Sequence, residues 1–388
     1  MISFDNTEIA FRNKTNADLN RAYWLFKLIG NNSLVKIGNA LMRFSLKLQL
    51  PIKGIIKHTT FKQFCGGENI NECAKTIALL AKYSIGTILD YSVEGKEEEN
   101  DLDKTMNEII ATIHKAKGNA AIPFCVFKTT GIASNHILEK VNKKEILAPS
   151  EKEKFIQIKH RVNKICKTAF DNEVPLFIDA EESWRQNTID ELATEMMEIY
   201  NKQKPIVYNT LQMYRTDRID FLKQVLSKAG EKNYFLGLKL VRGAYLEKEN
   251  NRAEEFRELS PIHQSKADTD NSYNEALKIC IENIYRIAIC AGTHNEKSSL
   301  YLSQLMEEKN IQKNHSHIYF SQLYGMGDHI SYNLANGGYN VVKYVPYGPV
   351  EEVLPYLVRR AEENTSIAGQ TGRELGLIIK EKKRRKLK

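Results

Sequence analysis

The sequence lacks any long hydrophobic run. No stretch of its 388 residues approaches 18 consecutive uncharged apolar residues, so we expect no transmembrane helix. Its first residues, MISFDNTEIAFRNKT, contain no apolar core and carry acidic side chains at positions 5 and 8, so we expect neither secretion nor import into an organelle. A composition of 42% apolar and 27% charged residues is typical of a globular protein with a sizeable core.

Several signatures of catalysis and metal binding are also missing. There is no G-x-S-x-G, no Walker loop and no catalytic Cys/His signature, which weakens hydrolase interpretations. The six cysteines form no C-x-x-C pair, and Cys125 and Cys290 lie in apolar strand-like runs, so we expect buried, reduced thiols. His315 and His317 flank a single serine and His294 has no second ligand close by, so we expect no metal site.

The net charge of +8 is concentrated at one end of the chain. Residues 380–388, KEKKRRKLK, hold seven basic and one acidic side chain, hence +6 of the +8, and leave a nearly neutral body. Such a basic segment is most often a solvated, disordered end. Contact with an anionic membrane is the next interpretation, and we expect no nucleic acid as a partner.

Alternating patterns predict the fold. Helical spacing covers residues 17–50, interrupted at 31–33, and about 71–84. Eight strand-like runs follow, at 86–91, 121–128, 175–181, 206–212, 234–242, 287–292, 317–325 and 341–347. Helix-like segments separate most of them, at 102–117, 155–170, 190–202, 219–229, 273–285 and 298–308. This order predicts an α/β protein with a (β/α)8 barrel.

A doubly wound sheet would also alternate, but no G-x-G-x-x-G follows the first strand. We therefore expect an N-terminal helical segment (1–70), a catalytic barrel (71–370) and a basic C-terminal tail (371–388). The gaps at 129–174 and 243–286 are too long for simple helical returns, and we expect them to hold insertions that cover the site.

Polar residues recur where the predicted strands end, which is where barrels place their chemistry. They are Lys128, Asp179 and Glu181, Gln212, Arg242, Thr293 to Asn295, Gln322 and Tyr324, and Tyr344 to Tyr347. Polar caps at a barrel mouth explain any one of them. Their recurrence at seven of eight ends indicates an enzyme.

The stretch VVKYVPYGPVEEVLPYLVRRAEENT (341–365) is a strand, a Gly-Pro break and a helix. Its helix carries an apolar stripe that includes Val353 and Leu357. A second stripe, roughly opposite, consists of Tyr356, Arg359, Arg360 and Glu363. The spacing alone favours a solvated outer face, and the alternative is that the adjacent guanidiniums bind a substrate carboxylate.

Several motifs resemble those of the proline dehydrogenase family. They are LDYSVEG (89–95), FIDAEES (177–183), LQMY (211–214), KLVRGAYLEKE (239–249), GTHN (292–295), YGM (324–326) and KYVPYGPVEEVLPYLVRRAEEN (343–364). The resemblance covers residues 60–370. It implies a distorted barrel with FAD across the strand ends and a last helix over the barrel mouth, which would turn the arginine stripe toward the site.

The resemblance also implies roles for individual residues. Arg359, Arg360 and Lys128 would bind the proline carboxylate, with Asp179 orienting Lys128. Packing of the proline ring is implied for Leu240, Tyr245, Tyr344 and Tyr356. The flavin would contact or be supported by Gln212, Lys239, Val241, Arg242, Gly243, Ala244, Thr293, His294, Asn295 and Glu363. Some family members have arginine at position 239, where a single ammonium can still donate near the reactive nitrogen.

The implied reaction converts L-proline to 1-pyrroline-5-carboxylate and passes electrons to a membrane quinone. We expect a monofunctional chain, cytoplasmic and peripheral at the membrane, with a separate pyrroline-5-carboxylate dehydrogenase downstream. Two alternatives stay open. A hydroxyproline dehydrogenase would keep the scaffold, although Tyr344 crowds the space of a ring hydroxyl. A non-enzymatic protein that binds membranes or nucleic acid would depend on the basic tail alone.

Overall fold

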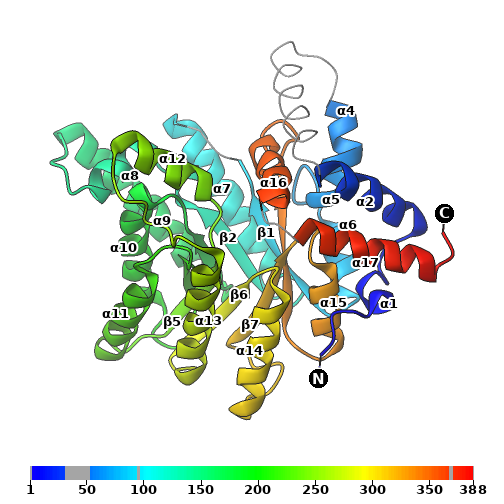
Figure 1. Ribbon diagram of the computed structural model, residues 1–388. Coiled ribbons are helices and arrows are strands. Elements are labelled where there is room, and N and C mark those ends of the chain that lie inside the picture. The colour runs from blue at the N-terminus through cyan, green and yellow to red at the C-terminus, as the bar shows by residue number, and fades with distance from the viewer. Residues whose placement is uncertain (1, 31–52, 94–96, 367–369, 388) are drawn as a thin grey trace. The chain divides into compact units, whose positions relative to one another are not determined.

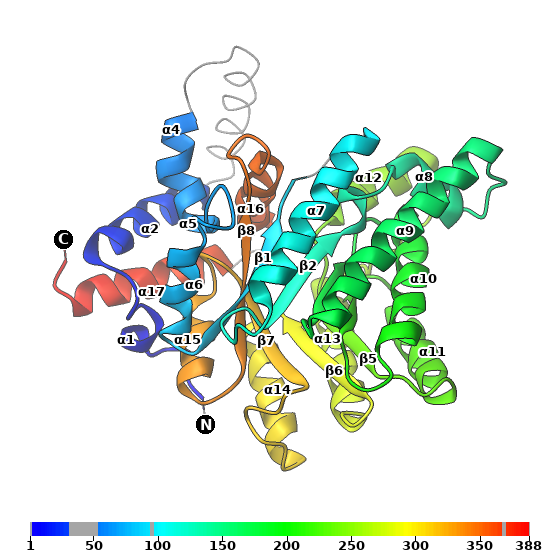
Figure 2. The ribbon, with the colours of Figure 1, turned by 180° about the vertical axis from the view of Figure 1, so that it is seen from behind.

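The computed structural model describes residues 2–30, 53–93, 97–366 and 370–387 (Figures 1 and 2). Its eight strands run in chain order around a closed barrel. They are β1 (Ile85–Tyr91), β2 (Phe124–Lys128), β3 (Leu176–Asp179), β4 (Val207–Gln212), β5 (Leu236–Val241), β6 (Ile287–Gly292), β7 (Ile318–Leu323) and β8 (Val341–Tyr347). The predicted (β/α)8 fold is confirmed, and no strand boundary is wrong by more than three residues.

The close contacts of the chain divide it into two compact units. The first consists of residues 1–87, 92–94 and 322–388, and the second of residues 88–91 and 95–321. In the described part of the chain, no helix is both long enough and apolar enough to cross a membrane. All six cysteines are buried and reduced, as predicted, and burial raises the pKa of Cys125 to about 12.

The second unit holds most of the alternating pattern. Its main helices are α7 (Glu99–Ala116), α9 (Pro149–Asp171), α10 (Ser183–Tyr200), α11 (Arg218–Glu231), α13 (Lys266–Glu282) and α14 (Glu296–Glu308). The two long gaps contain α8 (Asn135–Asn142) and α12 (Leu246–Phe256). Aromatic rings pack between the strands. The rings of Phe124 and Phe177 are stacked with their centres 4.5 Å apart, and the ring of Tyr208 meets both of them edge to face. These buried rings fix the register of β2, β3 and β4.

The first unit contains the remaining elements. They are α1 (Thr7–Ala10), α2 (Asn16–Ile29), α4 (Lys53–Ile56), a π-helical turn (Lys57–Phe61), α5 (Lys62–Phe64), α6 (Ala74–Ala81), α15 (Asp328–Asn336), β8, α16 (Leu354–Ser366) and α17 (Gln370–Arg384). Thr15 begins α2 with a capping box, because it exchanges hydrogen bonds with Asp18. The second half of the helical region predicted at 17–50 lies outside the described residues.

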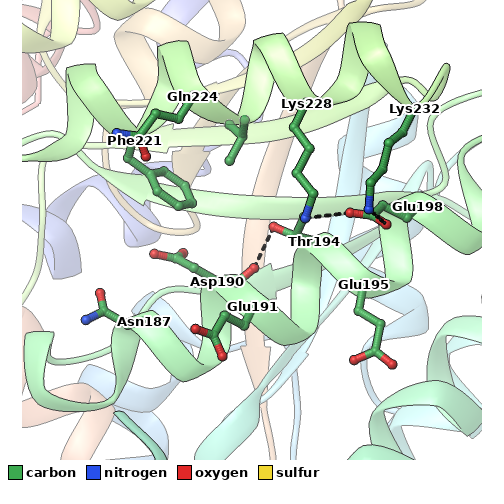
Figure 3. Close-up of a pocket in the computed structure, with 11 residues that line it drawn as sticks. Asn187, Asp190, Glu191, Thr194, Glu195, Glu198, Phe221, Gln224, Lys228 and Lys232 are labelled. Carbon is green, nitrogen blue, oxygen red and sulfur yellow. Dashed lines mark hydrogen bonds and ion pairs between the residues drawn. The ribbon is translucent and has the colours of Figure 1, made fainter. Parts of the chain in front are cut away.

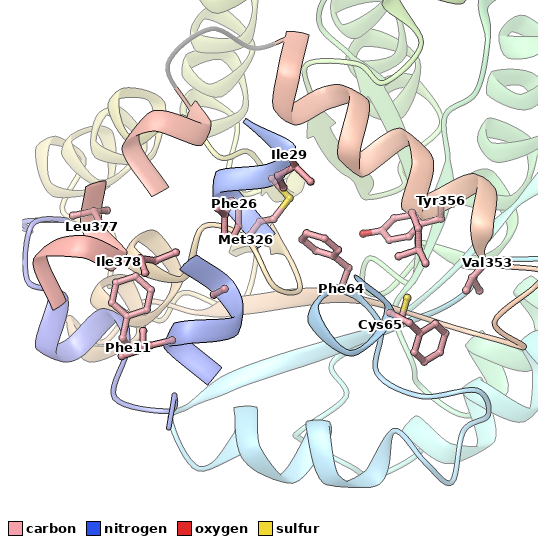
Figure 4. Packing of buried hydrophobic residues seen from close by; sticks show 14 of the residues in the cluster. Phe11, Phe26, Ile29, Phe64, Cys65, Met326, Val353, Tyr356, Leu377 and Ile378 are labelled. Carbon is pink, nitrogen blue, oxygen red and sulfur yellow. The ribbon is translucent and has the colours of Figure 1, made fainter. Parts of the chain in front are cut away.

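One apolar core joins the helices of the first unit (Figure 4). Phe26 and Ile29 of α2 belong to it together with Leu377 and Ile378 of α17. Val353 and Leu357, from the apolar stripe predicted on the last barrel helix, belong to the same core. The regular helix begins only at Leu354, after a turn at 350–353.

The basic C-terminal segment is helical, so the predicted disordered end is wrong. Arg385 donates to the carbonyl oxygens of Phe11 and Lys14, both at 2.8 Å, and to Glu381 at 2.7 Å. Arg384 lies 3.3 Å from Glu8. Net charge alone could not predict this outcome, because it does not show which charges find partners in the fold.

Candidate active site

The predicted strand-end residues of the second unit lie at the C-terminal ends of consecutive strands. Lys128 ends β2 and Asp179 ends β3, and the two residues are register partners. Gln212 ends β4 and is the register partner of Val241, which ends β5. Thr293 follows β6 directly. Because parallel strands place these ends at one edge of the sheet, the structure brings this set together.

A buried ion pair joins Lys239 of β5 to Asp179 of β3. The exposed fraction is 6% for Lys239 and 7% for Asp179. The ammonium also lies 5.3 Å from the ring centre of Phe177. The family resemblance pairs Asp179 with Lys128 and gives no sign of this partner on β5. The orientation of Lys128 by Asp179 stays a prediction.

A second network surrounds Glu181, which follows β3. Its carboxylate accepts a hydrogen bond from the backbone N–H of Thr130 at 2.9 Å and another from the Thr130 hydroxyl. Burial raises the pKa of Glu181 to about 7, although these hydrogen bonds oppose the shift. Gln212 donates to the carbonyl oxygen of Glu181 at 2.7 Å and accepts from the N–H of Ala244 at 3.2 Å. The side chain of Gln212 therefore connects the end of β3 to the loop after β5.

Arg242 donates hydrogen bonds to three side chains. Its Nε donates to Asp270 at 2.7 Å, and its two Nη atoms donate to Thr293 at 2.6 Å and Ser298 at 2.9 Å. The guanidinium also lies 4.4 Å from the ring centre of Tyr273. Arg242 thus connects β5, β6, α13 and α14. Asp270 and Ser298 were missed because they lie within or near helix starts, where their types suggest only solvent contact.

The loop after β5 requires glycine at position 243. Its φ is +139°, and a Cβ atom there would lie 2.5 Å from the ring of Tyr214. The next predicted site residues, Ala244 and Tyr245, lead into α12, and Tyr245 is buried. Leu240, predicted to touch the proline ring, is fully buried on β5.

The loop after β6 is organised by Asn295. Its side-chain oxygen accepts from the N–H groups of Lys297 at 2.9 Å and Ser298 at 3.2 Å, so it caps the start of α14. This capping gives Asn295 a structural role, and its predicted contact with the flavin remains untested. His294 lies half-buried in the same loop.

The remaining predicted site residues belong to the first unit. Tyr344 on β8 is 8% exposed, and on α16 Tyr356 and Arg360 are 4% and 6% exposed. The guanidinium of Arg360 lies 5.1 Å from the ring centre of Tyr356, and Arg359 is half-buried. The interpretation of this stripe as a solvated face is therefore wrong. Glu363 also lies in α16, but its side chain is outside the described part of the chain.

A crevice of about 500 Å³ lies elsewhere, between α10 and α11 (Figure 3). Lys228 and Lys232 both pair with Glu198 across it, at 2.6 and 2.7 Å. These helices carry none of the predicted site residues, so we do not assign chemistry to the crevice. Among the residues described by the structure, no three His, Cys, Asp or Glu side chains are grouped to hold a metal ion.

Comparison with known proteins identifies the family. The family model for proline dehydrogenase matches residues 73–373. Proline dehydrogenase 1, mitochondrial, of Dictyostelium discoideum is 32% identical to this chain, over 98% of this chain and 74% of the relative. A more distant relative is the hydroxyproline dehydrogenase of Xenopus laevis, which is 27% identical over 97% of this chain and 88% of the relative.

A solved structure agrees with the fold. Proline utilization A of Bdellovibrio bacteriovorus superposes with a TM-score of 0.74 and 22% identity, over 93% of this chain. The match covers 38% of that longer protein. The family match and the 32% identical relative show that this chain belongs to the proline dehydrogenase family and is an oxidoreductase that acts on proline.

Proposed function

We propose that this chain oxidises L-proline to 1-pyrroline-5-carboxylate, with FAD as its cofactor and a membrane quinone as electron acceptor. Membership of the family supports the oxidation of proline. The observation that carries the finer proposal is the set of charged and amide side chains near the ends of β3, β4 and β5, where barrels bind their ligands: the buried Asp179, Gln212 and Lys239, and the half-buried Arg242. The enzyme would work at the cytoplasmic membrane, and a separate pyrroline-5-carboxylate dehydrogenase would consume its product.

The donor groups of the second unit fit a flavin dinucleotide by their chemistry. A flavin offers ring carbonyls, ring nitrogens and a pyrophosphate, all of which accept hydrogen bonds. Lys239 on β5 and Arg242 directly after it supply cationic donors, and Gln212 supplies an amide on the neighbouring strand. We assign flavin contacts to these three and to Val241, Gly243, Ala244, Thr293, His294, Asn295 and Glu363. When bound, the flavin takes up the hydride from the ring carbon beside the proline nitrogen.

The protein's own contribution is to bind and orient proline. We assign the carboxylate to Arg359 and Arg360, because guanidiniums form paired, charge-assisted hydrogen bonds with carboxylates. We also assign carboxylate binding to Lys128, and here the only support is the resemblance to the family. Leu240, Tyr245, Tyr344 and Tyr356 would pack the ring. The low exposure of these four side chains would keep water away from the reacting carbon.

An absorbance spectrum and an activity assay test this proposal together. The purified protein should show flavin bands, reduce a soluble dye when L-proline is added, and form pyrroline-5-carboxylate in equal amount. A protein that releases a different flavin, or that oxidises proline without forming this product, would contradict the proposal. Reconstitution with a quinone in vesicles then tests the acceptor separately.

Hydroxyproline is the second candidate substrate. The distant hydroxyproline dehydrogenase relative favours it, and the bulk of Tyr344 opposes it. The ratio of the two specificity constants decides between the substrates, and we expect it to favour proline.

A further inference from the structure

We propose that the outer faces of α2 and α17 form one surface that docks on an anionic lipid bilayer. We call it the α2–α17 surface, and it consists of Tyr23, Trp24, Lys27, Leu28, Ile379, Lys382, Lys383 and Lys386. This proposal rests on the proposed function in one respect: a membrane quinone as acceptor requires that the chain meet the membrane, and the surface is where it would do so. All its evidence lies outside the redox site.

The apolar part of this surface is exposed on helices whose other face is fully packed. On α2, Phe26 and Ile29 face the core of the first unit, while Trp24 and Leu28 are 58% and 52% exposed. Trp24 and Leu28 are four residues apart and therefore share one face of the helix. Ile379 on α17 is 36% exposed. Tryptophan with aliphatic neighbours on the outside of a helix is typical of segments at a membrane interface.

Direct contacts join the two helices into a single surface (Figures 1 and 2). The rings of Tyr23 and Trp24 meet edge to face at 5.3 Å. Lys27 lies 5.0 Å from the Trp24 ring centre, and Lys382 of α17 lies 4.4 Å from the Tyr23 ring centre. Ile379 precedes Lys382 by three residues, so it lies on the same side of α17. Aromatic, aliphatic and ammonium groups are thus adjacent.

The surface is positively charged, and its lysines are available to bind an external partner. The acidic groups nearby are already used: Asp18 pairs with Arg21 at 2.7 Å, and the buried Glu381 pairs with Arg384 and Arg385. Among the described residues, none supplies a carboxylate within 4.0 Å of the four lysines of the surface, Lys27, Lys382, Lys383 and Lys386.

This combination fits a bilayer better than a nucleic acid. Lysines attract anionic lipid headgroups, and the lysine stem reaches from the apolar zone to the headgroups. Trp24, Leu28 and Ile379 can enter the boundary between headgroups and acyl chains. A phosphate backbone would use the lysines alone and leave these three side chains in water. We therefore assign an anionic lipid surface as the partner.

Trp24 is a built-in reporter for the experiment. The chain has two tryptophans, so Trp184→Phe leaves Trp24 as the only one. Vesicles of phosphatidylcholine with 30% phosphatidylglycerol should shift its emission to shorter wavelength, and brominated acyl chains should quench it. Vesicles of phosphatidylcholine alone should do neither. Vesicle binding without quenching by brominated lipid would overturn the proposal, because Trp24 would then not enter the bilayer.

A matched pair of variants tests the lysines. Replacing Lys27, Lys382, Lys383 and Lys386 by Gln should weaken vesicle binding at least tenfold at low salt. The control replaces four exposed lysines of the second unit, Lys115, Lys117, Lys144 and Lys154, by Gln and removes the same net charge. Equal loss in both variants would show attraction by net charge and overturn the proposal, as would undiminished binding of the first variant.

Oxidation of proline with a soluble dye should be unchanged in both variants. This measurement separates the docking surface from the proposed function. If the unmutated protein does not reduce the dye with proline, only the proposed function is contradicted, and the vesicle experiments still test the surface. A gel-shift assay with duplex DNA should show no difference between the two variants. Selective loss of DNA binding in the surface variant, with vesicle binding retained, would assign the surface to nucleic acid instead.

Discussion

Lys343 of β8 and Asp328 at the start of α15 form an ion pair of 2.8 Å in which Lys343 is fully buried. Lys14 approaches the same carboxylate at 3.3 Å. Burial alone would raise the pKa of Asp328, but the two ammonium groups lower it to about 2. The carboxylate therefore stays ionised and compensates two cations inside the first unit.

We expect Lys343→Met to lower the free energy of unfolding by about 3–5 kcal/mol, because it leaves a buried carboxylate short of a partner. Urea denaturation measures this. Lys204→Met is the control: its pair with Glu173 is exposed, so its loss should change the free energy of unfolding far less. A loss for Lys343→Met no larger than the control would show that the pair contributes little. The double variant with Asp328→Asn should lose less than the sum of the two single changes.

Glu181 gives a prediction for pH. Its pKa is about 7 in the folded protein and 4.5 in its ordinary state. Between these values the folded protein holds a proton that the unfolded chain has released, so stability falls as pH rises through this window. Glu181→Gln should remove this slope, on the order of 2 kcal/mol between pH 5 and 8. Denaturation at several pH values checks it, with the partly exposed Glu195→Gln as control. If the free energy of unfolding of Glu181→Gln and of the unmutated protein changes with pH in the same way, the Glu181 carboxyl has its ordinary pKa in the folded protein.

Gly243→Ala tests the loop after β5. The new Cβ would meet the Tyr214 ring at 2.5 Å with a φ of +139°, so we expect a loss of roughly 2–4 kcal/mol. Gly230→Ala, in α11 with no atom within 4 Å of the new Cβ, should instead stabilise by up to about 1 kcal/mol. Thermal unfolding of both variants provides the comparison. Similar melting temperatures would mean that the loop adapts without strain.

Arg359→Met tests the proposed carboxylate site. We expect proline binding to weaken by about 1.5–3 kcal/mol, hence roughly 10- to 150-fold, because a hydrogen bond to a charged group is lost. The flavin content should persist. Steady-state kinetics measure the change, and Arg286→Met, which removes an arginine from the second unit outside the site, should leave the kinetics intact. An unchanged Michaelis constant for proline would remove Arg359 from carboxylate binding.

Tyr344→Ser tests substrate choice. A smaller side chain at the proposed ring wall should make room for a hydroxyl, so the preference should move from proline toward hydroxyproline. The measurement is the ratio of the two kcat/KM values. If this ratio does not change, Tyr344 does not contact the substrate ring.

The barrel could be predicted because most of its strands are short apolar runs bounded by helical patterns, as in β6 (IAICAG), which was placed at its observed bounds. The strand-end residues followed from the same reasoning. The ion pair between Lys239 and Asp179 could not be predicted. The two residues are 60 positions apart, and their strands, β5 and β3, are not adjacent in the barrel. The burial of Arg360 was hidden for a similar reason, since a helix pattern gives a residue's face but not what covers that face.

The helix α17 illustrates the limit of charge counting. The sequence shows seven basic side chains in nine residues, which is typical of disorder. Leu377 and Ile378, together with the buried Glu381, pack this helix into the first unit. Long-range partners such as the Phe11 carbonyl then hold its end.

The pairing of α2 with α17 has a consequence for biosynthesis. The second unit is almost one continuous stretch, residues 95–321, so most of its internal contacts can form before residues 322–388 have been synthesised. The first unit must wait, because its parts come from residues 1–87 and 322–388. At 5–20 residues per second, roughly 10–50 s separate the emergence of the two parts. During that time Phe26 and Ile29 lack their partners Leu377 and Ile378 on α17, so these apolar side chains stay uncovered on the nascent chain until its last helix is made.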